Sequence, residues 1–255
     1  MTPRSIRLIA LSGLPLVQPG DDVAQLISES LERDGLGLQD DDILVLAQKI
    51  VSKSEGRRVR IAEVEPSAQA TEVATLTGKD PRLVELVLRE SRCVLRFRPG
   101  VLIVEHRLGF VMANAGIDLS NVDHADGETA LLLPSDPDAS CTAIRSALHA
   151  HWGCDIGVII NDSHGRAWRN GTVGVAIGVA GLPALQDLRG KPDLFGRELL
   201  STEVGLADEL ASAASLLMGQ AAEGCPAILV RGMRWERREG QARELIRPAQ
   251  MDLFR

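Results

Sequence analysis

Apolar, β-branched segments alternate along the chain with segments of helical periodicity, and this alternation limits the possible fold more than any other feature. Strands are predicted where short apolar runs are bounded by turn residues: residues 43–51, 101–105, 109–113, 131–133, 155–160 and 227–230. Helices are predicted where apolar residues recur at helical spacing: residues 68–76, 80–90, 136–151 and 203–218. This order predicts a mixed α/β architecture of the α+β class.

Neither common nucleotide-binding loop is present. The sequence has no G-x-x-x-x-G-K-[ST] and no G-x-G-x-x-G between a strand and a helix, so we expect neither a P-loop nor a Rossmann fold. A glycine-rich stretch at residues 171–181 leaves two interpretations open. Its glycines could cradle a phosphate, or they could permit close packing of a strand.

Composition excludes several classes of protein. The chain has 255 residues and a net charge of −7, whereas a protein that wraps nucleic acid usually carries a basic face. Its longest weakly polar stretch, residues 172–185, is too short to cross a bilayer. Residues 1–7 lack the apolar core and cleavage site of a leader, so we expect them to be unprocessed. The four cysteines are far apart, which indicates reduced, mostly buried thiols in a cytoplasmic protein.

Polar residues that follow apolar strands are the candidate site, because strand ends project side chains from a rigid base. Asp118 and Asn121 lie in a glycine-led loop and could offer oxygen ligands to Mg²⁺ or Mn²⁺. An Asx-turn is the alternative. Asp162 and Ser163 come directly after the strand predicted at residues 155–160, and they could bind metal or cap a turn.

Basic residues lie near these candidates. Arg166 and Arg169 follow Asp162 closely and suit a polyanionic substrate, although surface ion pairs would explain them equally well. Lys49 and Lys53 flank a predicted turn and could contact phosphate. A solvated loop is the alternative for these two lysines.

Taken together, the chain resembles the gamma-glutamyl ligase family of coenzyme F420 biosynthesis from residue 14 to about residue 232. The segments that carry the resemblance, in this order, are residues 19–22, 48–57, 114–121, 133–138, 162–171 and 207–210. Each segment is weak alone, but the ordered set is specific. The resemblance implies the fold of that family, a GTP co-substrate, Mn²⁺ or Mg²⁺ with K⁺ as a further cation, and a homodimer.

The resemblance also assigns roles to residues. The implied metal ligands are Asp118, Asp162, Ser163 and Gln220. The implied GTP contacts are Leu14, Pro15, Leu16, Val17, Gln48, Lys53, Asn121, Gly219 and Gln220. Asp118, Asp162 and Lys53 are the residues from which we expect catalysis. Two positions depart from the family: Leu16 replaces a glutamate, and His164 stands where a bulky apolar residue is common.

We expect residues 1–255 to form a single catalytic unit, which two subdomains could share. Some relatives carry a further flavin-binding domain that this chain is too short to hold, so we expect ligation without a fused reductase step. The expected substrates are F420-0, L-glutamate and GTP, joined through an acyl phosphate. Two alternatives remain: a metal-dependent phosphohydrolase that releases phosphate from GTP without glutamate, and a non-catalytic nucleotide-binding module.

Overall fold

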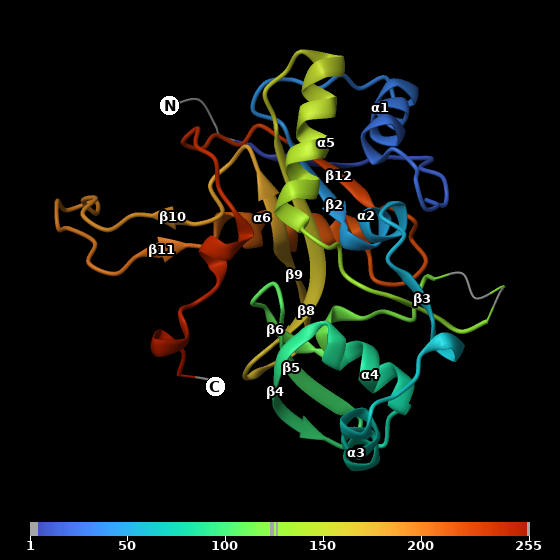
Figure 1. Cartoon of the computed structure of the whole chain (residues 1–255). Coiled ribbons are helices and arrows are strands. Elements are labelled where there is room, and N and C mark those ends of the chain that lie inside the picture. Colours follow the sequence, from blue (N-terminus) through green and yellow to red (C-terminus); the bar gives the residue numbers. More distant parts are fainter. Residues whose placement is uncertain (1–4, 123–124, 126, 254–255) are drawn as a thin grey trace.

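A five-stranded sheet forms the centre of the larger of two regions of the molecule (Figure 1). The computed structural model describes residues 5–122, 125 and 127–253, so part of the N-terminal segment expected to be unprocessed lies outside the described residues. The strands follow the order β1 (Arg7–Ala10), β12 (Ala227–Arg231), β2 (Ile43–Ala47), β8 (Gly157–Arg166) and β9 (Arg169–Ala180). Only the β2–β8 pair in this sheet is parallel, which differs from a doubly wound nucleotide fold.

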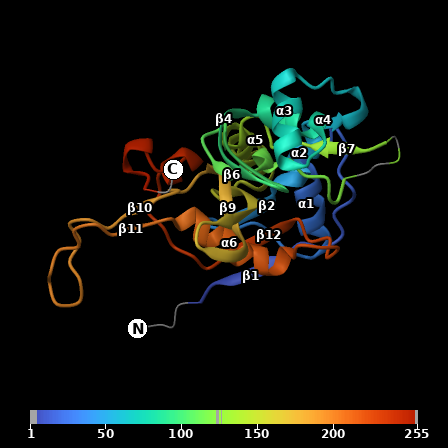
Figure 2. The same ribbon diagram turned by 90° about the horizontal axis from the view of Figure 1, so that it is seen from below.

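Helices cover both faces of this sheet, and the strands alternate to match them (Figure 2). Leu44 and Leu46 of β2 pack with α1 (Val23–Arg33) and α5 (Pro137–Trp152) on one face. Ile43 and Val45 pack with α6 (Leu206–Met218) on the other face. Because both faces are buried, the central strands are continuously apolar, which is why they are visible in the sequence. We call the five strands with α1, α5 and α6 the sheet body.

A smaller region, residues 58–133, lies below the sheet body in Figure 1, and we call it the small lobe. It holds a three-stranded sheet of β4 (Ser91–Arg98), β5 (Val101–His106) and β6 (Val111–Ala113). Helices α3 (Ala68–Thr77) and α4 (Pro81–Arg89) pack against it, and a third apolar cluster fills the interior. The remaining elements are β3 (Arg58–Arg60) paired with β7 (Thr129–Leu131), and the short helices η1 (Ile61–Glu63) and η2 (Asn114–Gly116).

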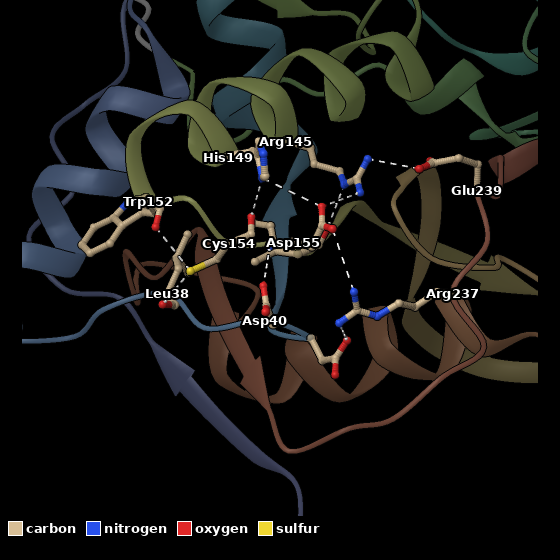
Figure 3. Close-up of polar contacts among 11 residues, drawn as sticks. Leu38, Asp40, Arg145, His149, Trp152, Cys154, Asp155, Arg237 and Glu239 are labelled. Carbon is tan, nitrogen blue, oxygen red and sulfur yellow. Dashed lines mark hydrogen bonds and ion pairs between the residues drawn. The ribbon is translucent and has the colours of Figure 1, made fainter.

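A two-stranded hairpin of β10 (Gln186–Asp187) and β11 (Glu203–Val204) projects from the sheet body at the left of Figure 1. We call residues 186–204 the arm. The chain then ends in η3 (Ala242–Leu245) and η4 (Ala249–Met251). Arg145 of α5 holds the charged tail by an ion pair to Glu239 at 3.1 Å and also pairs with Asp155 at 3.2 Å (Figure 3). The tail from Trp235, whose order the sequence leaves undecided, is therefore tied to the body.

Local signals in the sequence set most helix ends correctly. Asp80 and Asp136 cap α4 and α5 through their side chains, and a proline follows each cap. Gly78 ends α3 in the left-handed conformation that glycine tolerates. At Gly178, the glycine-rich stretch serves close strand packing, because a Cβ there would lie 2.5 Å from the carbonyl oxygen of Pro137. Close packing of α5 on β9 therefore requires that glycine.

Several predicted elements are wrong at their ends. The strands predicted at residues 109–113 and 131–133 are β6 and β7, which instead span Val111–Ala113 and Thr129–Leu131. The strand predicted at residues 43–51 stops at Ala47, and Gln48 begins α2 (Gln48–Ser54). Its partner strand is preceded by Pro226, which has no N–H to continue the ladder. The strand predicted at residues 155–160 instead continues to Arg166, because it pairs with β9 along that length. The helix predicted from residue 203 begins at Leu206, since Glu203 and Val204 belong to the arm.

Two predictions about composition have mixed outcomes. All four cysteines are free, but only Cys141 is fully buried, so the prediction of mostly buried thiols is wrong. Among the described residues, none of the helices has the length and apolar character that a membrane span needs.

Candidate functional site

A cavity of about 740 Å³ opens where β2 ends and its parallel neighbour β8 continues beyond it. Ala47 and Asn161 are register partners at this edge, so α2 and Asp162 start from neighbouring points of the sheet. The wall consists of the N-terminal segment, α2, the loop at residues 121–122, β8 and the loop after α6. Its residues are Leu14, Pro15, Leu16, Val17, Gln18, Ala47, Gln48, Lys49, Ile50, Lys53, Arg58, Asn121, Val122, Asn161, Asp162, Ser163, Met218, Gly219, Gln220, Ala221, Ala222, Glu223, Gly224, Cys225 and Pro226.

Asp118 reaches this site from the small lobe. Its backbone exchanges two hydrogen bonds with Leu131, at 3.0 and 2.9 Å, which fix the loop. Its side chain forms an ion pair with Lys49 and accepts a hydrogen bond from Gln48 Nε2 at 3.2 Å. Burial raises the pKa of Asp118, the Lys49 ammonium opposes that rise, and the Asp162 carboxylate adds to it. The two predicted metal-binding carboxylates therefore lie within Coulombic reach of one another.

Helix α2 supplies the polar side chains that face Asp118. Ser52 Oγ donates to Gln48 Oε1 at 2.9 Å, one helical turn away, and this bond turns the amide nitrogen of Gln48 toward Asp118. Lys49 and Lys53 are four residues apart and share a helix face. The sequence placed these lysines beside a turn, and the structure corrects this, because the helix begins as soon as β2 ends.

Asp162 and Ser163 lie on β8 rather than in a loop, because the β8–β9 hairpin is longer than the sequence predicts. The Asp162 side chain is 11% exposed, and its Oδ2 lies 3.0 Å from His164 Nε2. His164 in turn packs edge-on against Phe110, with ring centroids 6.3 Å apart. The His164 ring therefore packs against Phe110 while it also contacts the Asp162 carboxylate.

Asn121 joins the two sides of the cavity. Its backbone oxygen accepts a hydrogen bond from Lys53 Nζ at 2.7 Å, and its side-chain nitrogen donates to the Ala221 oxygen at 3.0 Å. Asn121 has φ 55, a left-handed conformation that asparagine adopts more readily than most residues. The loop of the small lobe is thereby tied to α2 and to the loop after α6.

The loop after α6 presents backbone N–H groups toward a negative charge. The N–H groups of Ala221, Glu223 and Gln220 surround the Glu223 carboxylate and hold its pKa below the usual value. The Ala221 contact measures 2.8 Å. Convergent backbone N–H groups of this kind form an anion-binding concavity. Glu223 therefore occupies a place that also suits a phosphate.

The predicted nucleotide and metal residues come together, with two exceptions among the basic candidates. Residues 14–17, 48, 53, 121, 162, 163, 219 and 220 all line the cavity, and Asp118 contacts two of its lining residues. Arg166 and Arg169 instead lie at the turn of the β8–β9 hairpin, where Arg166 Nη1 donates to the Gly171 oxygen at 3.2 Å. Their predicted contact with a polyanion is not supported by this placement.

Two residues gain importance from the structure. Lys49, which the sequence offers only as one of two basic residues, is the direct counter-ion of Asp118. Arg58 also lines the cavity and donates to the Val17 oxygen at 3.3 Å. No local sequence signal distinguishes Arg58 from other arginines, because its position depends on how β3 passes the N-terminal segment.

The donor set fits a hard divalent cation. Asp162, Ser163 and Gln220 line the same cavity, and Asp118 lies within Coulombic reach of Asp162. Oxygen ligands of these kinds suit Mg²⁺ or Mn²⁺. The carboxylates of Asp118 and Asp162 repel each other, and a bound cation would neutralise their negative charge. Within the described ranges, no group of three or more His, Cys, Asp or Glu residues forms an all-protein metal cage.

Comparison with known proteins identifies the family. Residues 13–232 match the model of the F420-0:Gamma-glutamyl ligase family. The coenzyme F420:L-glutamate ligase of Methanothermobacter thermautotrophicus is 50% identical over 252 residues, which cover 98% of this chain and 99% of that protein. The protein of the same name from Methanopyrus kandleri is 49% identical over 243 residues, 94% of this chain and 93% of that protein. The chain therefore belongs to the F420-0:gamma-glutamyl ligase family.

Proposed function

We propose that this protein joins L-glutamate by an amide bond to the deazaflavin precursor F420-0, with GTP as the co-substrate. Relatives with the printed name coenzyme F420:L-glutamate ligase align over nearly the whole chain, which supports the substrates. One structural observation carries the proposal: Asp118 and Asp162, from different regions, approach each other beside a cavity large enough for a nucleotide.

The reaction requires an activated carboxylate, because an amine does not displace an oxygen atom from a free carboxylate at a useful rate. A carboxylate oxygen of F420-0 would attack the γ-phosphorus of GTP and release GDP, which gives an acyl phosphate. The glutamate amine would then attack the acyl carbon and lose a proton. The tetrahedral intermediate would collapse as the bond from carbon to the phosphate oxygen breaks, which leaves the amide and inorganic phosphate. Later cycles would use the γ-carboxylate of the added glutamate.

The residues of the cavity fit this scheme. Asp118, Asp162, Ser163 and Gln220 would hold Mn²⁺ or Mg²⁺, with K⁺ as a further cation. When bound, the divalent ion supplies positive charge beside the transferring phosphoryl group. Lys53 and the backbone N–H groups of residues 220–223 would position the phosphates. Residues 14–17 would contact the nucleotide through their backbone, because Leu16 has no carboxylate.

Mass spectrometry tests the ligase proposal against its alternatives. The purified protein is incubated with GTP, Mn²⁺, L-glutamate and F420-0, and each component is omitted in turn. A glutamylated product that requires all components supports the ligase. Phosphate released without glutamate or F420-0 would support a phosphohydrolase. GTP binding without any product would support a non-catalytic module.

We also propose a homodimer that works in the cytoplasm, with residues 1–255 as one catalytic unit. Apolar side chains on the arm support the dimer: Leu194, Phe195 and Leu200 are 98%, 94% and 78% exposed. Side chains of this size are usually covered when several occur together. A second copy of the chain is the partner that the family resemblance favours.

A further inference from the structure

A second cavity, of about 370 Å³, lies beside the nucleotide cavity. Its wall consists of the β5–β6 turn, β8, β9, the start of α6 and the C-terminal tail. The lining residues that carry the argument are Phe110, His164, Ala176, Asp208, Ile246 and Arg247.

Strand β8 connects the two cavities. Asp162 and Ser163 line the first cavity, and His164, one residue further along the chain, lines the second. The 3.0 Å contact between His164 Nε2 and Asp162 Oδ2 spans the boundary. A ligand in the second cavity would thus lie next to the place where the carboxylate of F420-0 is activated.

Asp208 is the polar group that distinguishes this cavity. It lies in the first turn of α6, and its Oδ1 accepts a hydrogen bond from the Ala176 N–H at 2.9 Å. Among the described residues, its Oδ2 has no hydrogen-bond donor. Burial raises the pKa of Asp208, and the Ala176 N–H and His164 only partly offset this effect. A partly buried carboxylate that has one free oxygen is stabilised by a cationic ligand.

The rest of the wall combines charges of both signs with apolar side chains. Arg247 provides positive charge and Asp252 a second carboxylate on the same wall as Asp208, while Phe110 and Ile246 are apolar. L-Glutamate carries an ammonium group, two carboxylates and methylene groups, which are the groups that a wall of this mixed character can contact. The cavity volume lies in the range of small-molecule sites.

We propose that this second cavity binds the L-glutamate co-substrate and that Asp208 receives its α-ammonium group. The proposal rests on the proposed ligase function for the identity of the amino acid. Asp208 belongs to the segment at residues 207–210, which resembles the family but has no role in the nucleotide cavity. The neighbouring cavities bring amine and activated carboxylate together without sharing a wall residue.

The test is calorimetric binding of L-glutamate to the full chain with Mn²⁺ and a non-hydrolysable GTP analogue. Asp208→Asn removes the charge but keeps an oxygen that can accept from the Ala176 N–H, so the fold is expected to persist. We expect its Kd for L-glutamate to rise about tenfold or more, the usual effect of losing a charged hydrogen bond. The affinity for the GTP analogue is expected to stay unchanged. Glu209→Gln, an exposed neighbour, is the matched control and is expected to bind like the parent.

A ligand without the ammonium group separates recognition from a structural effect. The parent protein is expected to bind 2-hydroxyglutarate at least about tenfold more weakly than L-glutamate, and Asp208→Asn is expected to lose this preference. Equal weakening of both ligands in the variant, or no preference in the parent, would overturn the proposal. Absence of glutamate binding to the parent would overturn it as well. Glutamate binding without any ligated product would contradict the proposed function and leave the pocket assignment standing.

Discussion

The sheet body and the small lobe are stabilised in different ways, and the candidate site needs both. In the sheet body, helices bury both faces of the sheet, and Leu44, Ile159 and Ile228 have no exposed surface. In the small lobe, helices cover one face, and the outer strand β4 leaves Phe97 49% exposed. The site takes Asp162 from the first region and Asp118 from the second. Its geometry therefore depends on the contact between a strongly packed region and a less covered one.

The small lobe, which has less apolar packing than the sheet body, contains a buried ionic network around Glu90. Glu90, whose side chain is 8% exposed, binds Arg57 at 2.8 Å and Arg107 at 2.6 Å. Arg57 also donates to the Leu133 oxygen at 2.8 Å, so the network joins α4 to the start and the end of the lobe. Ion pairs thus hold segments of the small lobe together, whereas apolar packing does so in the sheet body.

The largest expected effect comes from removing one carboxylate on either side of the site. Asp118→Asn and Asp162→Asn are each expected to lower turnover by about 10²–10³ or more, because electrostatic stabilisation of the transferring group is lost. Thermal unfolding is expected to change little, and Glu72→Gln, on the exposed surface of α3, is the control. Full activity in both variants would refute the shared role of the two regions.

Core truncation measures the difference in packing. Leu44→Ala in the sheet body and Leu102→Ala in the small lobe each delete a fully buried side chain and are expected to cost about 2–5 kcal/mol. In hydrogen exchange, Leu102→Ala is expected to expose amides of the small lobe first, whereas Leu44→Ala weakens the whole molecule. Identical exchange patterns would mean that the two regions unfold as one unit.

Neutralising the ionic network is expected to have a smaller effect. Glu90→Gln is expected to cost about 2 kcal/mol, because the guanidinium groups lose a charged acceptor. Burial acts to raise the pKa of Glu90, but His106, Arg57 and Arg107 outweigh it and leave the pKa below the usual 4.5. This stabilisation is therefore present above pH 4.5 and lost as the pH falls below it. Denaturant unfolding should show the parent and variant converging in acid. A difference that persists there would contradict the charge-based explanation.

The smallest effect on the fold is expected for the arm. Phe195→Ser is expected to change the unfolding free energy of the protomer by less than about 0.5 kcal/mol, because the side chain contacts little within one chain. It should weaken the proposed dimer, as measured by sedimentation at several concentrations. Leu76→Ser, exposed on α3, is the matched control. An unchanged dimer would remove the arm from the interface.

Local sequence determined several helix ends and predicted the strands β2, β5, β6, β7, β8 and β12, whereas β1, β3 and β4 were not predicted. Asp80, Asp136 and Gly78 act within a few residues of their position, and the structure confirms their roles. The same reasoning did not predict α1, although Asp22 caps it and Val23, Ile27 and Leu31 lie on one face. The ordered motifs also identified the family and a part of the wall of the cavity of about 740 Å³, which includes residues 14–17, 162 and 163.

Only the tertiary structure decided which of these residues meet. The length of β8 depends on its pairing with β9, and the end of β2 depends on Pro226, which precedes β12. Asp118 acquires Lys49 as its counter-ion through a contact between residues 69 positions apart. Asp208 and His164 share a cavity for the same reason. Helix propensity and capping act over a few residues, whereas strand pairing and burial join distant segments. The sequence therefore indicates which side chains could take part in the site, and tertiary packing determines which of them are in contact.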